Sequence, residues 1–259
     1  MDAQGANAVM RVVLWALMAC GLLTACAGPA PVDTAARERA SIRLALAQAY
    51  YEQGQYTVAL EEVERSLAID ATAAPAHVLH GLALMALRQP ERARSSLDRA
   101  LALDGRLVSA WHNRAWLSCQ QGQWATAQAD FAQALVWASV AERAQALMVD
   151  GVCAARAQAW DRAEQRLSQA LDIEPQNPVA RYHWAQVQQS RGQWAQAQWT
   201  LQSLNTSPHA NAESLWLAIQ GAQQLGDTAA VAQWAQTLEQ RFPQSAQWDA
   251  YQRKSVHDR

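Results

Sequence analysis

The chain lacks a strong charge of either sign and has few of the residues that favour strands. Its 259 residues carry 21 Lys and Arg against 23 Asp and Glu, for a formal net charge of −2. No basic stripe is present that could neutralise a phosphate backbone, which argues against a nucleic-acid partner. β-branched residues are few, whereas Ala and Gln, both good helix formers, are abundant. The composition therefore predicts a helical protein, long enough for a sizeable core or for several stacked repeats.

The sequence also lacks a recognisable catalytic or metal-binding constellation. Its Asp and Glu residues are scattered, with no pair that suggests acid–base chemistry, and it has no glycine-rich phosphate-binding loop. His77 and His80 lie three residues apart, but no cysteine or carboxylate stands at metal-ligand spacing beside them. These absences predict that the protein is not an enzyme and that it has no cofactor, no metal site and no small-molecule substrate.

What is present begins with an apolar N-terminal segment. Arg11 precedes the run VVLWALMACGLL, which is too short for an ordinary membrane span. The segment closes in Leu23-Thr24-Ala25-Cys26, which resembles the lipobox of bacterial lipoproteins, where cleavage falls just before the cysteine and lipid is added to its thiol. The resemblance implies a signal peptide over residues 1–25 and a lipid anchor on Cys26. An ordinary signal peptide that merely contains a cysteine is the alternative.

Two features near this cysteine bear on where the protein is found. The residue after it is Ala27 and not an aspartate, which by the usual sorting rule implies the outer membrane. The segment 26–39 is rich in Pro and Ala, so we expect a lipidated tether between the membrane and the body of the protein. The resemblance thus implies a lipid-anchored protein on the periplasmic face of the outer membrane.

A pattern with a period of 34 residues starts at residue 40 and can be laid down six times. Residues 110–135 show it most clearly, as two amphipathic helices joined by a turn at Gly122, which can adopt a positive φ. A small residue, Ala127, lets the helices approach closely, while Phe131 fills the space between them. One such hairpin cannot bury its apolar face alone, so it needs stacked neighbours.

The pattern resembles the tetratricopeptide repeat. The resemblance implies an all-α fold, a superhelix of six helix-turn-helix repeats, followed by a polar C-terminal tail over residues 246–259. Trp124, Trp160 and Trp194 recur at one position of the repeat, and we interpret them as core residues. The predicted repeats cover residues 40–73, 74–107, 108–143, 144–177, 178–211 and 212–245.

Two cysteines remain once Cys20 is assigned to the signal segment and Cys26 to the lipid site. Cys119 and Cys153 fall on the first helices of repeats three and four, where two extra residues lengthen the junction. Because the periplasm is oxidising, the pair predicts a disulfide that joins these repeats. Two separate buried thiols, each acting as a small hydrophobe, are the alternative.

In tetratricopeptide arrays the first helices line a concave groove. When the groove positions of the family are mapped onto this chain, the early and middle parts are apolar where solvent would favour polar residues. Such a stripe predicts a site for a peptide partner; the alternative is that neighbouring helices cover some of its members. The predicted groove residues are Leu44, Tyr51, Val78, Leu82, Met85, His112, Trp116, Met148, Val152 and Tyr182, with the polar Gln48, Arg156, Gln186 and Gln189 among them.

Several segments are more specific than a general repeat consensus. The segments ERAQALMVDGVCAAR, AESLWLAIQGAQQLGD and RFPQS, together with NRAWLSCQQGQW and the first repeat, resemble the type IV pilus biogenesis and stability lipoproteins of the PilF/PilW kind. Members of that family act as pilotins, which bind the outer-membrane secretin of the pilus and promote its localisation and multimerisation. The resemblance implies the same role here. A tetratricopeptide lipoprotein adaptor for outer-membrane or cell-wall assembly, binding a different peptide partner, is the alternative.

Overall fold

The computed structural model describes residues 34–257, and these form thirteen helices without a strand. Successive helices pair through short turns, which confirms the predicted all-α superhelix of helix-turn-helix repeats. The predicted signal peptide and Cys26 lie outside the described residues. The helices are α2 (Thr34–Glu52), α3 (Tyr56–Ile69), α4 (Ala74–Ala86), α5 (Pro90–Leu103), α6 (Val108–Gln120), α7 (Trp124–Trp137), α8 (Val140–Arg156), α9 (Trp160–Ile173), α10 (Pro178–Ser190), α11 (Trp194–Asn205), α12 (Ala212–Leu225), α13 (Thr228–Arg241) and α14 (Ala246–His257).

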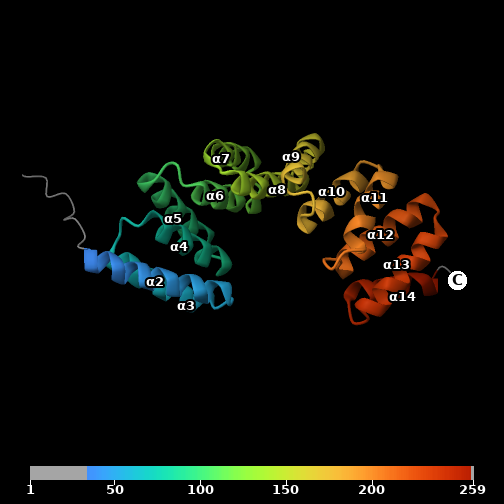
Figure 1. Cartoon of the computed structure of the whole chain (residues 1–259), viewed down its shortest axis with the longest axis horizontal. Helices are drawn as coiled ribbons and strands as arrows, with labels where there is room; N and C mark the ends of the chain where they lie inside the picture. Colours follow the sequence, from blue (N-terminus) through green and yellow to red (C-terminus); the bar gives the residue numbers. More distant parts are fainter. Residues whose placement is uncertain (1–33, 258–259) are drawn as a thin grey trace, which may run out of the picture.

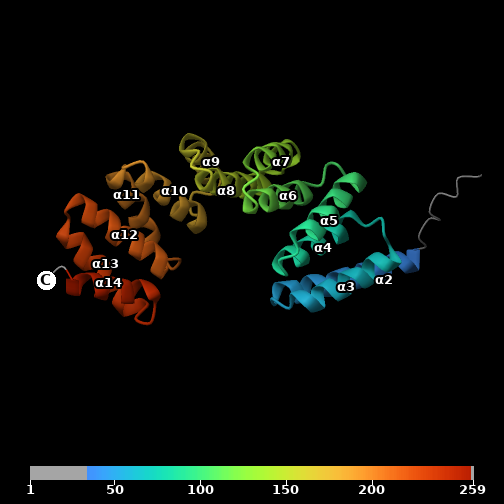
Figure 2. The same cartoon turned by 180° about the vertical axis from the view of Figure 1, so that it is seen from behind.

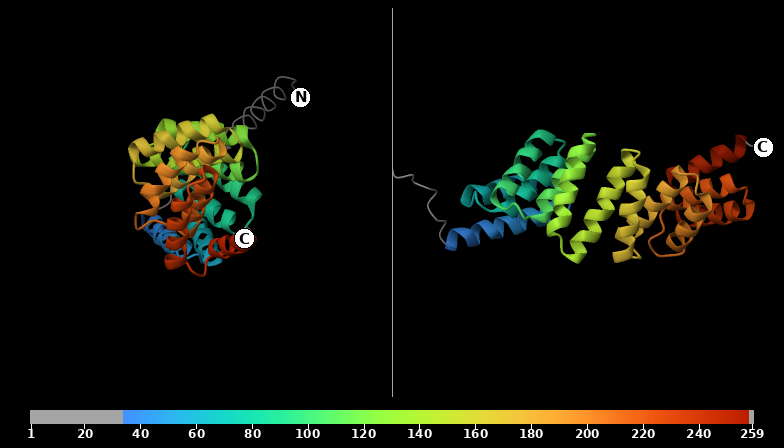
Figure 3. Two further views of the ribbon diagram at one scale, coloured as in Figure 1. Left: turned by 90° about the vertical axis from the view of Figure 1, so that its right-hand side faces the viewer. Right: turned by 90° about the horizontal axis from the view of Figure 1, so that it is seen from above.

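The helical pairs stack into an arch. Figure 1 shows α2 and α3 at one end and α12 to α14 at the other, with α6, α8 and α10 toward the open side and α7 and α9 on the outside. The view from behind and the view from above show the same succession of pairs (Figure 2 and Figure 3). The first helix of each pair contacts the first helix of the next, from α2 through α12, so these helices form a continuous inner wall. None of the described helices is both long enough and apolar enough to cross a bilayer.

The two helices of a pair approach closely where small residues face each other. A Cβ atom built onto Gly151 of α8 would lie 2.7 Å from Cγ of Leu167 on α9, so only glycine fits without a shift. Ala163 and Leu167 of α9 are fully buried at this contact. Protein interiors pack at the density of organic crystals, so a single extra methyl group at this contact would destabilise the fold.

The turns between paired helices use a left-handed residue. Gly122 has a φ of 72°, as its position in the sequence predicted. The two pairs without glycine at this position place Arg88 and Gln158 there, each with a φ of 57°. The interpretation of Trp124 as a core residue is wrong, because its side chain is 41% exposed. It begins the outer helix α7, and its ring lies beside the turn, where a Cβ atom built onto Gly122 would be 3.8 Å from Cζ2 of Trp124.

Three predicted boundaries need correction. α2 begins at Thr34, inside the segment predicted as a tether, because the run TAARER continues the helix. α8 begins at Val140, four residues before the predicted start of repeat four, because Ser139 and Glu142 form a capping box there. The predicted polar tail is helix α14, whose Trp248 and Tyr251 rings stack with centroids 5.6 Å apart and pack against the cluster formed by α12 and α13. The last helix therefore covers the end of the stack.

Candidate peptide-binding groove

The inner wall carries most of the predicted groove residues at half-buried positions. Each of these packs one side against the core, and the other side is open to solvent, as a contact surface requires. The half-buried members are Leu44, Tyr51, Leu82, Met85, His112, Trp116 and Tyr182. Whether they bind a partner stays a prediction.

Three of the predicted groove residues are core residues instead. Val78, Met148 and Val152 are only 6%, 7% and 9% exposed. Val78 packs in the cluster of α4, α5 and α6, and Met148 in that of α8, α9 and α10. The assignment of these three side chains to an open stripe was wrong because the neighbouring helices cover them, although Val152 still borders a hollow described next.

A hollow of about 360 Å³ lies in the inner wall between α8, α10 and α12. Polar groups at its rim are held in place by one another: Gln186 Nε2 donates to Tyr182 Oη at 2.9 Å, and Gln186 Oε1 lies 2.8 Å from His183 Nδ1. Burial lowers the pKa of His183 below its ordinary value, so the ring is neutral at neutral pH. The hollow is lined by Val152, Ala155, Arg156, Trp160, His183, Gln186, Val187, Gln189, Ser190 and Leu217.

Arg156 connects this hollow to the middle of the wall. Its guanidinium lies over the ring of Trp116, 4.6 Å from the ring centroid, and so joins α8 to α6. Trp116 in turn packs against the buried cluster that contains Cys119 and Cys153. The wall here offers an aromatic face, a cation and side-chain amides, a combination suited to an extended or helical peptide with apolar and acidic or carbonyl groups.

A second hollow of about 420 Å³ lies nearer the N-terminal end, between α4 and α6. Met85 and Leu117 line it together with the side-chain amides of Gln120 and Gln121. Met85 was among the predicted groove residues, so this part of the prediction coincides with a real depression. Methionine is flexible and polarizable, which suits a surface that must adapt to a partner.

Sequence reasoning missed several residues of the hollow between α8, α10 and α12. His183 and Leu217 lie one position away from those that line the groove in the family pattern, and Trp160 was interpreted as core. No sequence signal distinguishes them, because their exposure depends on how α8, α10 and α12 are rotated against one another. His112, by contrast, is held with its ring 5.9 Å from that of buried Phe131 in an edge-to-face contact, and burial lowers its pKa.

The two cysteines of the wall lie side by side. Cys119 of α6 and Cys153 of α8 are 1% and 4% exposed, and their Cα atoms are 5.8 Å apart, within the range of disulfides. The structure pairs their sulfur atoms in the buried cluster against which Trp116 packs. A bond there would hold α6 and α8 together at the centre of the groove.

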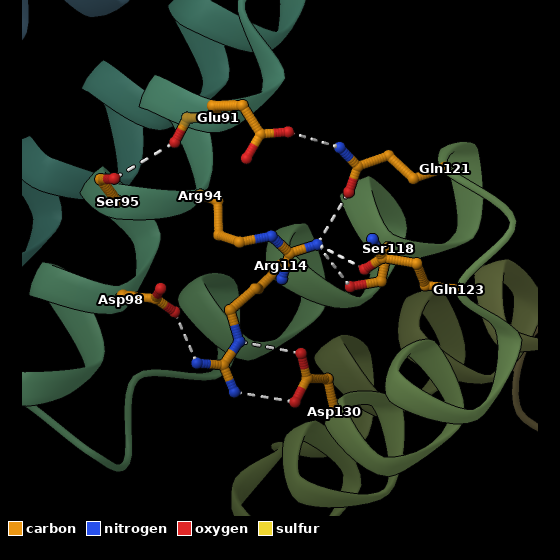
Figure 4. Close-up of polar contacts among 9 residues, drawn as sticks. All are labelled: Glu91, Arg94, Ser95, Asp98, Arg114, Ser118, Gln121, Gln123 and Asp130. Atoms are coloured by element: carbon orange, nitrogen blue, oxygen red, sulfur yellow. Dashed lines mark hydrogen bonds and ion pairs between the residues drawn. The ribbon is translucent and has the colours of Figure 1, made fainter.

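Charged side chains connect the inner wall to the outer helices. Arg114 of α6 donates two hydrogen bonds of 2.8 Å to Asp130 of α7 and one of 2.7 Å to Asp98 of α5 (Figure 4). These carboxylates raise the pKa of Arg114, chiefly through the bonds to Asp130. One helix of the inner wall is thus fixed to two outer helices, and the bidentate geometry sets its orientation.

A second arginine fixes the same junction. Arg94 of α5 donates from Nη2 to Ser118 at 3.1 Å, to Gln121 at 2.8 Å and to Gln123 at 2.9 Å, which joins the second pair to the third (Figure 4). Side chains held in this way lose no further freedom when a partner binds, which favours binding. Among residues 34–257 no group of three or more His, Cys, Asp and Glu could hold a metal ion.

Comparisons with known proteins agree with this architecture. Family models described as tetratricopeptide repeat match residues 40–72 and 154–219. The chain folds as a tetratricopeptide-repeat protein. A comparison with curated proteins finds no match. Repeats of this kind serve in general as scaffolds that present extended concave surfaces to partners.

Solved tetratricopeptide structures resemble nearly all of the described chain. PilF of Pseudomonas aeruginosa aligns with a TM-score of 0.73 and 19% identity, over 85% of this chain and 100% of PilF. PilW, described as a widely conserved type IV pilus biogenesis factor, aligns with a TM-score of 0.75 and 23% identity, over 82% of this chain and 97% of PilW. YrrB, described as having an unusual peptide-binding site, reaches a TM-score of 0.57 at 14% identity, over 74% of this chain and 97% of YrrB. The suspected PilF/PilW-type architecture is therefore confirmed at the level of fold.

Proposed function

We propose that this protein is an outer-membrane-anchored periplasmic pilotin, which binds the secretin of the type IV pilus and promotes its localisation and multimerisation. The observation that carries the proposal is the inner wall itself. Half-buried apolar and aromatic side chains follow one another along it from Leu44 to Tyr182, and two hollows interrupt it. A wall of this kind fits a single peptide segment better than a small molecule, because its contacts are spread over many repeats.

The mechanism follows from the arrangement of anchor and groove. A lipid on Cys26 would keep the protein at the membrane. The eight residues from 26 to 33 reach at most about 29 Å before α2 begins, so the groove would stay close to the bilayer. A secretin segment held in the groove would then be concentrated at the membrane into which the secretin inserts. Membrane attachment and secretin binding are then linked in one molecule. This linkage raises the local concentration of the secretin segment at the membrane without any new contact.

Two further observations support the pilotin role. PilW, whose fold this chain shares, is described as a type IV pilus biogenesis factor. PilF aligns over its whole length with 85% of this chain. The lipobox-like Leu23-Thr24-Ala25-Cys26 would supply the membrane attachment that a pilotin needs.

Deletion of the gene tests the proposal. Heat-resistant secretin multimers, followed by gel mobility, should disappear in the deletion strain, and surface pili should be lost. The wild-type gene should restore both. A Cys26→Ser variant should be expressed yet leave the multimers reduced or in the wrong membrane. Normal multimers and normal pili in the deletion strain would overturn the proposal. If instead the multimers persist while cell-wall or outer-membrane assembly fails, the adaptor alternative holds.

A further inference from the structure

The outer helix α11 differs from the other outer helices in having no charged residue. Its sequence is WAQAQWTLQSLN, whereas α5 and α9 each carry both acidic and basic side chains. Trp199 at its centre is 77% exposed, more than any other large hydrophobic side chain of the described residues. The centres of protein–protein interfaces are depleted of charge and enriched in Trp, and α11 has that composition.

Hollows lie on both sides of Trp199. On the side of α9 and α10 there is one of about 670 Å³, whose apolar lining includes Leu171, Pro175 and Trp184. On the side of α12 and α13 there is one of about 370 Å³, bordered by Leu225 and Trp234. Trp199 borders both. The surface is thus a protruding indole between two depressions, a shape that can complement a copy of itself.

The charges at the rim of the larger hollow can also complement those of a second copy. Arg181 and Asp172 border the larger hollow, and neither makes an ion pair or a side-chain hydrogen bond with any residue of the range 34–257. A partner that paired with both side chains must place an acidic and a basic group around the uncharged helix α11. A second copy of this surface, turned by a two-fold rotation, offers that combination. In a two-fold contact Arg181 of one copy can face Asp172 of the other, and the reverse pair then forms as well.

We propose that this face of the protein, formed by α11 with the two hollows beside it, joins two copies of the chain. Trp199 of each copy enters a hollow of the other, and Arg181 of each faces Asp172 of the other. α11 is the second helix of its pair (Figure 1), whereas the groove is formed by the first helices, so we expect the dimer to leave both grooves open. Two grooves and two membrane anchors per assembly would strengthen attachment to a multimeric partner.

Sedimentation equilibrium of the full chain in a density-matched detergent, over a wide concentration range, tests the proposal. Wild-type protein should dimerise. Trp199→Arg should raise the dimer dissociation constant about 30-fold or more, the loss typical of a central hot-spot residue. Trp137→Arg is the matched control, because Trp137 is also an exposed indole, at 44%, on the outer helix α7. Circular dichroism should show the same helix content for all three proteins.

A charge exchange sharpens the test. Arg181→Asp alone and Asp172→Arg alone should each weaken the dimer, and the double variant should recover most of the loss, since the exchanged charges meet again across the two-fold axis. A chain that stays monomeric throughout, a dimer that Trp199→Arg leaves unchanged, or a double variant no better than the single ones would overturn the proposal. If the chain is monomeric and Trp199→Arg instead abolishes secretin multimers in cells, another protein covers this face and the second copy is rejected as its occupant.

Discussion

The guanidinium of Arg156 lies 4.6 Å from the centroid of the Trp116 ring, on the inner wall of the superhelix. A contact of the same kind, between Arg106 and Trp137 at 5.0 Å, lies outside the groove. The two pairs share their chemistry and differ in place. They therefore separate the effect of losing a cation–π contact from the effect of changing the groove.

Arg156→Glu should weaken binding of the secretin segment about 10-fold, because it removes a cation from the groove and repels an acidic or carbonyl-rich peptide. Trp116→Ala should weaken it further through the lost aromatic face. Titration calorimetry with the purified periplasmic part of the secretin measures both. Arg106→Glu should bind like wild type. Equal losses from Arg156→Glu and Arg106→Glu would show that the groove is not the binding surface.

Reduction of the Cys119–Cys153 pair should destabilise the protein. A disulfide between the two cysteines would close a loop of 34 residues, and chain-entropy reasoning gives a stabilisation of about 2–4 kcal/mol for a loop of that size. Urea unfolding with and without a thiol reductant measures the difference. Cys119→Ala with Cys153→Ala should behave like the reduced protein and should be insensitive to reductant. Intact mass after alkylation in denaturant without reductant checks the pairing directly: incorporation of label at Cys119 or Cys153 would contradict it.

Asp150→Asn should lower the free energy of unfolding by about 2 kcal/mol, because it breaks a buried charge pair and leaves its partners unmatched. The Asp150 carboxylate on α8 is 2% exposed and accepts a hydrogen bond of 2.8 Å from Arg162 of α9. It also forms an ion pair with Arg166 of α9, whose Nε lies 2.9 Å from Oδ2. Burial raises the pKa of Asp150, and the two guanidinium groups oppose that rise. Urea unfolding provides the measurement.

Asp161→Asn is the control for this change. Its carboxylate pairs with Arg191 but is 95% exposed, so the substitution should leave the unfolding midpoint almost where it was. An equal loss in the free energy of unfolding for both variants would show that the stabilisation by Asp150 does not come from the burial of its ion pair.

Acid should destabilise the protein through its half-buried histidines. Burial lowers the pKa of His80, His112 and His183 in the folded state below the ordinary 6.5. On acidification the unfolded chain therefore takes up protons first, so the free energy of unfolding falls as the pH drops through 6.5 toward the folded-state pKa values. Above that window the full stability is present. Urea unfolding at a series of pH values should show the decline.

His112→Gln should make the decline shallower, because it removes one of the titrating groups. His209→Gln is the control, since His209 lies at an exposed position before α12. A decline of the same slope in wild type and in His112→Gln would contradict the account, as would a stability that rises on acidification.

Much of the fold could be predicted from particular residues. Gly122 marks a turn because only the left-handed conformation ends the helix there, and Gly151 lies where two helices touch. The start of α8 was misplaced because a local capping box, Ser139 with Glu142, outweighs the repeat pattern. The helix α14 was missed because its apolar residues, such as Trp248, are few and gain their burial only from α12 and α13.

The candidate groove was predicted only in part. Trp116 and Met85 lie on the wall as expected, but Val78, Met148 and Val152 are covered by neighbouring helices. The surface around Trp199 had no counterpart in the sequence reasoning at all, since periodicity assigns a helix position and not the depth of the hollows beside it.

By itself, then, the sequence determined the helices, their pairing and the turns, because spacing of small and apolar residues and left-handed turn positions act locally along the chain. Only the tertiary structure decided which inner-wall side chains stay open, that Arg156 lies over Trp116, and that Trp199 protrudes between two hollows. Those outcomes depend on the rotation of each helical pair against the next, which is set by packing between residues of different repeats and leaves no periodic trace within any one of them.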